Sequence, residues 1–237
     1  MLCFQSNGKT VMNNRKISKL TIIIYTLFVI MISVLTTVMF YHVFIFETFK
    51  DNSQSQQTFF EISAEKVLSS PIKENNSIIE VMSYGCYYCG INNDAIMKFA
   101  EELPDDDNFK AIHLASKYTP LAAYAPIFAT LEEMNIEPSL RSAIFNSVLN
   151  DNVDFKNQVE LLAWLKKHNV DTEKYLEISN TPAVAEKLDY MESIAEFYNI
   201  TATPAFIINK RYVVYQDRDF PEFTKYMAEL LEKSKQE

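Results

Sequence analysis

Tyr-Gly-Cys-Tyr-Tyr-Cys-Gly, residues 84–90, is the stretch of this chain that decides its fold. It follows 77–83, whose apolar and β-branched residues predict a strand, and precedes 91–100, whose apolar spacing predicts a helix. Cys86 and Cys89 are therefore expected in the first turn of that helix. Unpaired backbone N–H groups and the helix dipole stabilise a thiolate there. A thiolate three residues from a second thiol is suited to thiol–disulfide exchange.

Two other interpretations of this cysteine pair have less support. A zinc site needs about four ligands. The remaining Cys and His residues of the chain are Cys3, His42, His113 and His168. The first two belong to a separate segment. Cys86 and Cys89 could therefore supply two zinc ligands, but the other two ligands are missing. A purely structural disulfide in one helical turn closes too small a loop to stabilise a fold much. We therefore expect no metal and no organic cofactor, the redox group being the Cys86–Cys89 disulfide.

The N-terminal segment has the composition of a membrane anchor. Residues 1–19 carry four Lys or Arg and no acidic residue, and 20–46 run for 27 residues without a charge. As a helix this run is about 40 Å long, which exceeds the ~30 Å hydrocarbon core of a bilayer. No signal-peptide cleavage site follows a short apolar core, so we expect an uncleaved transmembrane anchor at 20–46. The positive flank places 1–19 in the cytoplasm and the chain after about residue 47 outside.

The part of the chain after the anchor is acidic and has two cysteines, both in the Cys-x-x-Cys. It carries 18 Lys and Arg against 31 Asp and Glu, a net charge of −13. This balance argues against nucleic acid or an anionic lipid surface as a partner. An oxidising compartment favours chains with few unpaired thiols. Residues 47–58 are polar and predict a linker, and Cys3 is expected to be an inert cytoplasmic thiol.

Strands are predicted on both sides of a long helical stretch. A short strand is expected at 59–62. The strands at 78–83 and 109–114, joined through the helix at 91–100, predict a parallel β-α-β unit. Residues 205–214 predict two short strands around an Asn-Lys turn.

Between these strands the chain predicts a block of helices. They are expected at 121–134, 139–150, 155–168, 172–180 and 182–198. Ser139 and Thr172 are candidate N-caps, with Asp171 as a near alternative to Thr172. Trp164 shares an apolar helix face and is expected in the core, and 220–235 predicts a closing amphipathic helix.

This order, with Cys-x-x-Cys at the first helix and Thr-Pro beside a late hairpin, resembles the DsbA family of thiol:disulfide oxidoreductases. The resemblance covers roughly residues 59–235. It implies an α/β, thioredoxin-like fold with an all-helical insertion, here preceded by the anchor. The thioredoxin-like domain would comprise 59–118 and 195–237, with 119–194 as the insertion.

The resemblance implies a role for each matching residue. Cys86 would be the attacking thiolate and Cys89 the resolving thiol. Glu80, six residues before Cys86, matches a buried acid that helps to move protons between the thiols. Thr203 and Pro204 match the family's cis-proline element, which would bring the Thr203 backbone beside Cys86 to pair with an extended substrate peptide.

The chain also departs from the family pattern. The best-studied members have Pro-His between the cysteines, whereas this chain has Tyr87 and Tyr88, which cannot supply the charge of a histidine. A less depressed pKa of Cys86 would make the protein a weaker oxidant. The uncleaved anchor is a second departure. On the residues alone, two alternatives stay open: a solvated carboxylate at Glu80 and a trans peptide bond at Pro204.

We therefore expect a membrane-tethered periplasmic oxidoreductase that introduces disulfides into exported cysteine-containing proteins. By resemblance it would sit in a bacterial inner membrane with a single span, reoxidised by a quinone-linked, DsbB-like membrane protein. The direction of electron flow separates this hypothesis from a reductase or an isomerase on the same fold. A redox-inactive, tethered chaperone or peptide-binding module is an alternative of another class.

Overall fold

The computed structural model describes residues 19–41, 58–116 and 118–236 of the chain. It divides into two units, Met1–Ser55 and Gln56–Glu237. Most of the expected cytoplasmic segment and linker lie outside the described residues, and so do 42–46 of the expected anchor. The division of 59–237 into two thioredoxin-like parts and an insertion stays a prediction as far as its boundaries are concerned.

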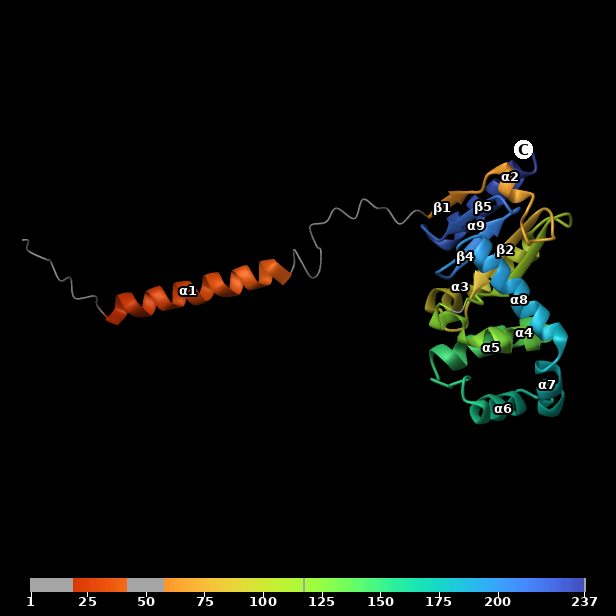
Figure 1. The fold of residues 1–237 in the computed structure, drawn as a ribbon, viewed down its shortest axis with the longest axis horizontal. Helices are drawn as coiled ribbons and strands as arrows, with labels where there is room; N and C mark the ends of the chain where they lie inside the picture. The colour runs from red at the N-terminus through yellow and green to blue at the C-terminus, as the bar shows by residue number, and fades with distance from the viewer. Residues whose placement is uncertain (1–18, 42–57, 117, 237) are drawn as a thin grey trace, which may run out of the picture. The chain divides into compact units, whose positions relative to one another are not determined.

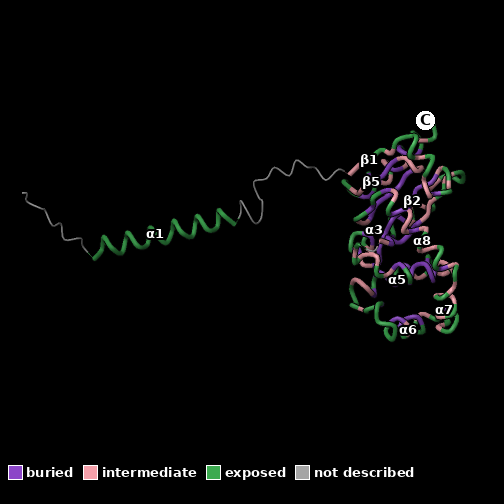
Figure 2. The backbone as a smooth tube through the Cα atoms, viewed as in Figure 1, coloured by how far each residue is buried: buried purple, intermediate pink, exposed green. Residues whose placement is uncertain are grey.

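Helix α1, Lys19–Phe40, is the described element of the first unit. Its mean hydropathy is 2.5 and none of its residues is buried, as the uniformly exposed tube in Figure 2 shows. It begins one residue before the predicted anchor and is about 33 Å long. Among the described residues it is the helix with the length and composition to cross a membrane.

The second unit is built on a five-stranded sheet with the strand order β1-β5-β4-β2-β3. Strands β2 and β3 run parallel, and the other neighbouring pairs are antiparallel. The strands are β1 Phe59–Glu61, β2 Ser77–Met82, β3 Asn108–His113, β4 Ala205–Ile208 and β5 Tyr212–Tyr215. The predicted strands and the parallel β-α-β unit are therefore confirmed. Asn209 and Lys210, both with positive φ, form the predicted turn between β4 and β5.

Each face of the sheet packs against a different set of helices. Helices α3, Tyr87–Glu102, and α9, Phe220–Ser234, lie against the face that carries Ile78, Phe206 and Val214. The opposite face, with residues such as Ile79 and Val213, joins the larger core that includes the helical insertion. The sheet is therefore buried on both sides at its centre, where β4 and β2 lie (Figure 2).

The chain between β3 and β4 is helical, as predicted. Figure 1 shows α4, α5, α6 and α7 gathered to one side of the sheet, with α8 leading back to it. The elements are η2 Pro120–Tyr124, α4 Ala125–Glu133, α5 Glu137–Leu149, α6 Gln158–Lys167, α7 Thr172–Ser179 and α8 Pro182–Phe197. Trp164 is buried in the core as predicted, and its indole N–H donates to Ser147 Oγ at 2.7 Å.

Two predicted helix starts in this block were wrong because of proline. The helix predicted at 121–134 is a 3-10 turn followed by α4, whose first turn contains Pro126. The helix predicted at 139–150 begins earlier, because Pro138 lies in the first turn of α5 and Ile136 is the N-cap in place of Ser139. A proline fits the first helical turn because its missing N–H would have no partner there.

Two further helices begin at polar caps. Asn157 caps α6, so Phe155 lies in the preceding turn and not inside the predicted helix at 155–168. Asp171, the alternative to Thr172, caps α7 by accepting from two backbone N–H groups. The short helix α2, Ala64–Val67, was not predicted, since one turn leaves no periodic signal.

Replacing Phe223 by alanine is expected to lower the free energy of unfolding by about 3–5 kcal/mol. Its ring is fully buried between α9 and the sheet, 5.3 Å from the ring of Phe206. Phe60→Ala is the matched control, because Phe60 is 39% exposed and its loss should cost about 1 kcal/mol or less. Urea unfolding of the chain in detergent micelles, followed by Trp164 fluorescence, measures both. Equal losses would contradict the placement of α9.

Candidate functional site

Cys86 lies where β2 has ended and α3 begins, and it is the N-cap of α3. Its Sγ accepts a hydrogen bond from the backbone N–H of Cys89 at 3.2 Å. The same sulfur lies 3.3 Å from the carbonyl oxygen of Thr203, to which the thiol donates. The local sequence therefore places one sulfur at a helix N-terminus, where N–H groups favour negative charge.

The two thiols differ in environment. Cys86 is 7% exposed and Cys89 is 1% exposed, and both are free. The pKa of Cys86 is lowered to about 6, chiefly by hydrogen bonding with the Cys89 thiol, helped by the backbone N–H groups of Cys89 and Tyr88. Burial raises the pKa of Cys89 far above its ordinary value, and the neighbouring Cys86 and Glu80 add to this rise. The pair therefore combines one thiolate with one protonated thiol near neutral pH.

Thr203 and Pro204 lie directly before β4, next to the cysteine pair. The peptide bond between them is cis, as the family resemblance implied, and the trans bond that the residues alone left open is wrong. Pro204 is buried, and the Thr203 carbonyl faces Cys86 across 117 positions of sequence. The structure thus brings together two elements that the sequence could connect only by resemblance.

Tyr87 and Tyr88 are the exposed residues of the motif. The two residues are 61% and 62% exposed, and their rings form an edge-to-face pair with centroids 5.7 Å apart. Tyr88 lines a cavity with Thr203 and Pro204, whereas Tyr87 lines a separate cavity between α3 and α5. The two phenols therefore form the outer surface around the less buried thiol.

Glu80 lies in the middle of β2 and is 3% exposed, so the alternative of a solvated carboxylate is wrong. Its neighbours across the sheet are Ala111 on β3 and Phe206 on β4, neither of which carries a charge. Burial above all, with Glu137 and Cys86, raises the pKa of Glu80; Arg141 opposes them, and together these effects place the pKa at about 7. A carboxyl that titrates near neutral pH beside a buried thiol can accept and return a proton.

A buried polar cluster that was not predicted from the sequence lies beside this site. Tyr84 Oη donates to Glu137 Oε1 at 2.7 Å, and Arg141 Nη2 donates to Glu137 Oε2 at 2.6 Å. Glu137 and Arg141 are 1% and 6% exposed, and both come from α5 of the insertion. Their spacing of four residues was the available signal.

His113 on β3 holds the loop before Cys86 from the sheet side. Its Nδ1 lies 2.9 Å from the Leu114 carbonyl oxygen, and its Nε2 accepts from the backbone N–H of Tyr84 at 3.1 Å. Because a carbonyl oxygen can only accept, Nδ1 carries a proton, and because Nε2 accepts a hydrogen bond, it carries none. The ring is therefore neutral. Burial agrees with this, because it lowers the pKa of His113 to about 4. His113 therefore acts as a fixed acceptor for the loop before Cys86.

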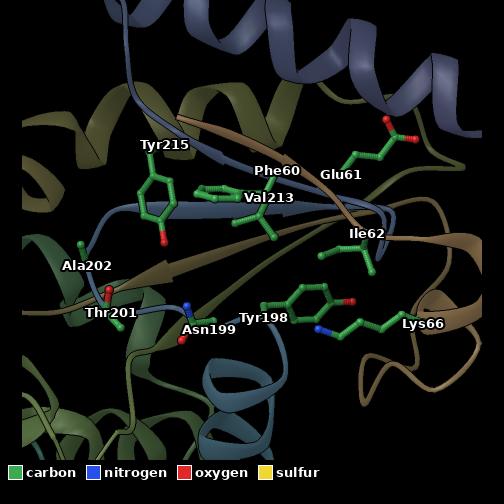
Figure 3. Close-up of a pocket in the computed structure, with 10 residues that line it drawn as sticks. All are labelled: Phe60, Glu61, Ile62, Lys66, Tyr198, Asn199, Thr201, Ala202, Val213 and Tyr215. Carbon is green, nitrogen blue, oxygen red and sulfur yellow. The ribbon is translucent and has the colours of Figure 1, made fainter. Parts of the chain in front are cut away.

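A groove begins at the cis-proline and continues away from the thiols. A cavity of about 590 Å³ lies against Tyr88, Thr203 and Pro204. It shares Ala202 and Tyr215 with a second cavity of about 410 Å³. Figure 3 shows this second cavity, with aromatic and aliphatic side chains from the β1 and β5 strands facing Tyr198 and Lys66.

Alkylation of the reduced chain by iodoacetamide is expected to follow the Cys86 thiolate, with a midpoint near pH 6. A Cys3→Ser background leaves Cys86 and Cys89 as the thiols that can react. Adding Cys86→Ser is expected to abolish alkylation below about pH 8, because Cys89 is buried and protonated. Mass spectrometry of quenched samples measures the rates, and a midpoint near pH 9 would contradict the geometry described.

Two kinds of comparison relate this chain to known proteins. The model of the DsbA-like thioredoxin domain family matches residues 107–228, more than half of the chain. The thiol:disulfide interchange protein DsbA of Pseudomonas aeruginosa is 25% identical over 163 residues, covering 68% of this chain and 75% of that protein. The corresponding protein of Azotobacter vinelandii is 26% identical over 136 residues, covering 57% of this chain and 63% of that protein.

Solved structures show the same fold. The crystal structure of Pseudomonas aeruginosa DsbA aligns with a TM-score of 0.67 at 23% identity, over 75% of this chain and 92% of that one. The oxidoreductase NmDsbA1 of N. meningitidis aligns with a TM-score of 0.62 at 20% identity, over 76% and 93%. Together with the family match, they establish that the chain belongs to the DsbA-like thioredoxin-domain family of thiol:disulfide oxidoreductases.

Proposed function

We propose that this chain is a membrane-tethered thiol:disulfide oxidoreductase that introduces disulfides into exported proteins through Cys86 and Cys89. One observation carries the proposal: an acidic thiol at the N-terminus of α3 lies beside a buried thiol with a strongly raised pKa. A low pKa of Cys86 stabilises the reduced form relative to the disulfide, which makes the disulfide an oxidant.

The order of the exchange steps follows from the exposure of the two sulfurs, because a substrate thiolate can reach Cys86 more easily than Cys89. A substrate thiolate attacks Cys86 Sγ of the Cys86–Cys89 disulfide, forming a bond to Cys86 and releasing Cys89, which takes up a proton. A second substrate thiolate then attacks the substrate sulfur of this mixed disulfide. Cys86 leaves as a thiolate, so the substrate loses two electrons and the protein gains them. Glu80 is the nearby group suited to supply and recover the proton of Cys89.

Substrate binding is assigned to the cis-proline loop and its groove. The Thr203 backbone beside Cys86 can pair with an extended peptide by strand addition. The cavity lined by Tyr88, Thr203 and Pro204 adjoins this position and can receive side chains of the same peptide. Its mixed apolar and polar lining suits substrates of varied sequence.

The apolar helix α1 supports tethering to a bacterial inner membrane. With Lys19 and the other basic residues on the cytoplasmic side, the redox unit would face the periplasm. A quinone-linked, DsbB-like membrane protein is the reoxidising partner we propose. A tether in the same membrane would raise the effective concentration of the redox unit near such a partner.

The equilibrium reduction potential tests the direction of electron flow. The chain with Cys3→Ser, in detergent micelles, is titrated against reduced and oxidised glutathione, with Cys86→Ser as the blank. We expect a value well above that of thioredoxin, between about −180 and −120 mV. A value near −270 mV would identify a reductase on this fold. Failure to titrate would identify a redox-inactive chaperone or peptide-binding module.

Removal of residues 1–46, with export of the remaining chain as a soluble protein, is expected to change which envelope proteins become oxidised. The tether restricts the redox unit to proteins that emerge close to the membrane. Differential thiol labelling followed by mass spectrometry compares the two forms at equal abundance. Identical substrate profiles would show that the tether has no part in substrate choice.

A further inference from the structure

The backbone stretch that would pair with a substrate also forms one wall of the second cavity. The Thr203 carbonyl oxygen lies 3.3 Å from Cys86 Sγ. Ala202, one residue earlier, lines both the cavity beside the cis-proline and the cavity of about 410 Å³ shown in Figure 3. Thr201 and Asn199 line the second cavity but not the first. A peptide that pairs with this stretch beside the thiols is therefore led directly over the second cavity.

The opposite wall of the second cavity offers aromatic surface from β1 and β5. Phe60 is 39% exposed, although its ring packs edge-to-face on Tyr215 with centroids 6.3 Å apart. The hydroxyl of Tyr198 shares a hydrogen bond with Ser70 Oγ at 2.7 Å and donates to the Lys210 carbonyl oxygen at 3.0 Å. The Tyr198 ring is therefore left to line the cavity. Open aromatic surface in a cavity of this size is typical of a site for an apolar side chain.

Tyr215 stands where the two cavities join, since it lines both. Its hydroxyl makes no hydrogen bond to any residue that the structure describes. Figure 3 shows this hydroxyl pointing toward Ala202 and Thr201. A peptide that crosses from one cavity to the other passes the hydroxyl, which can donate to a carbonyl oxygen or accept from an N–H group.

The charges at the rim of the second cavity do not cancel. Glu61 is neutralised by Arg211, whose Nη2 and Nε lie 2.7 and 3.1 Å from its Oε1. Lys66 has no ion-pair partner in the described part of the chain, and its Nζ lies 5.0 Å from the centre of the Phe197 ring. The described rim therefore carries an uncompensated positive charge, which an acidic residue of a bound peptide would complement.

We propose that the second cavity is a substrate subsite, which takes an aromatic or long aliphatic side chain of the extended peptide while Lys66 faces an acidic residue beside it. The inference rests on the proposed exchange through Cys86 and Cys89. An extended strand advances one residue for each residue of the strand it pairs with, so the inserted side chain, opposite 199–201, lies roughly two to four residues from the reacting cysteine. The preferred substrates are polypeptides that combine a cysteine, an aromatic residue and an acidic residue at this spacing.

A scan of peptides tests the position of the inserted side chain. Each peptide is made of Gly and Ser around Cys-Gly-Gly-Cys, with one Phe placed one to six residues before the first cysteine or after the second. The oxidised full chain with Cys3→Ser, in detergent micelles, is mixed with excess peptide. The two peptide thiols become a disulfide as the Cys86–Cys89 disulfide becomes two thiols, and mass spectrometry of acid-quenched samples measures the rate.

The concentration dependence of this rate separates binding from chemistry. At a spacing of two to four residues, on one side of the cysteines, the half-saturating peptide concentration is expected to fall about tenfold relative to the peptide without Phe. The maximal rate is expected to change little, because the subsite binds the peptide far from the reacting sulfurs. Oxidation of dithiothreitol, which has no side chain to insert, measures the thiol chemistry of each variant separately.

Phe60→Ala removes part of the aromatic wall. The gain from the best-placed Phe is expected to fall from about tenfold to about twofold, because the two rings no longer pack on each other. Ile91→Ala is the matched control. Ile91 is 57% exposed and close to the cysteines on α3, but it lines the separate cavity between α3 and α5, so the full gain should remain.

Lys66→Glu tests the charge at the rim. With Glu or Lys placed next to the Phe, the wild type is expected to favour the Glu peptide about two- to fivefold at low salt, and Lys66→Glu to reverse this preference. Lys166→Glu changes the net charge equally, but it lies on α6 in the insertion (Figure 1) and should keep the wild-type preference. A preference that follows net charge in both variants would contradict the role of Lys66.

The remaining outcomes are also decisive. A scan in which the position of Phe has no effect would overturn the subsite, and so would equal losses in Phe60→Ala and Ile91→Ala. Unchanged peptide binding with weaker self-association of Phe60→Ala would assign the cavity to a second copy of the chain. If the wild type oxidises neither the peptides nor dithiothreitol, the proposed exchange fails. Fluorescence anisotropy of labelled peptides with Ser in place of Cys then still reports on the cavity.

Discussion

The hydrogen bond from the Cys89 N–H to the sulfur of Cys86 is the interaction on which the redox centre depends. It exists because β2 stops at Met82 and a tight loop delivers Cys86 to the N-cap of α3. The surrounding contacts keep that loop in place. His113 holds it from the sheet and Glu137 from the insertion, both through Tyr84.

The same short segment shifts the pKa values of its two thiols in opposite directions. The thiol at the helix end is stabilised as an anion, and the thiol one turn later is buried and kept protonated. A depressed pKa in the folded, reduced protein adds stability that is present at alkaline pH and lost as pH falls through about 6. The reduced form therefore gains relative to the disulfide above that pH, which is the energetic basis of an oxidant.

The cysteine pair could be predicted from local signals, because the spacing of Cys86 and Cys89 lies between a clear strand pattern and a clear helix pattern. Glu80 and Pro204 came from the resemblance to the family, since the residues alone left a solvated carboxylate and a trans peptide bond open. Arg141 could not be found in this way, since a Glu and an Arg four residues apart usually mark an exposed helix face. Their burial follows from the packing of α5 on α3, which no local pattern encodes. The starts of α4 and α5 were misplaced for a related reason, because a proline near a boundary is compatible with either side of it.

The order of strands has a consequence for how the chain is made. Strand β4 lies next to β2 at the middle of the sheet, yet it follows Cys86 by more than a hundred residues. During synthesis both thiols emerge well before Thr203 and Pro204 can cover them. Contacts this distant in sequence form late and slowly. A newly made chain therefore passes through a stage in which its own thiols are accessible but their pKa values are not yet those of the folded site. At that stage they are themselves open to thiol–disulfide exchange.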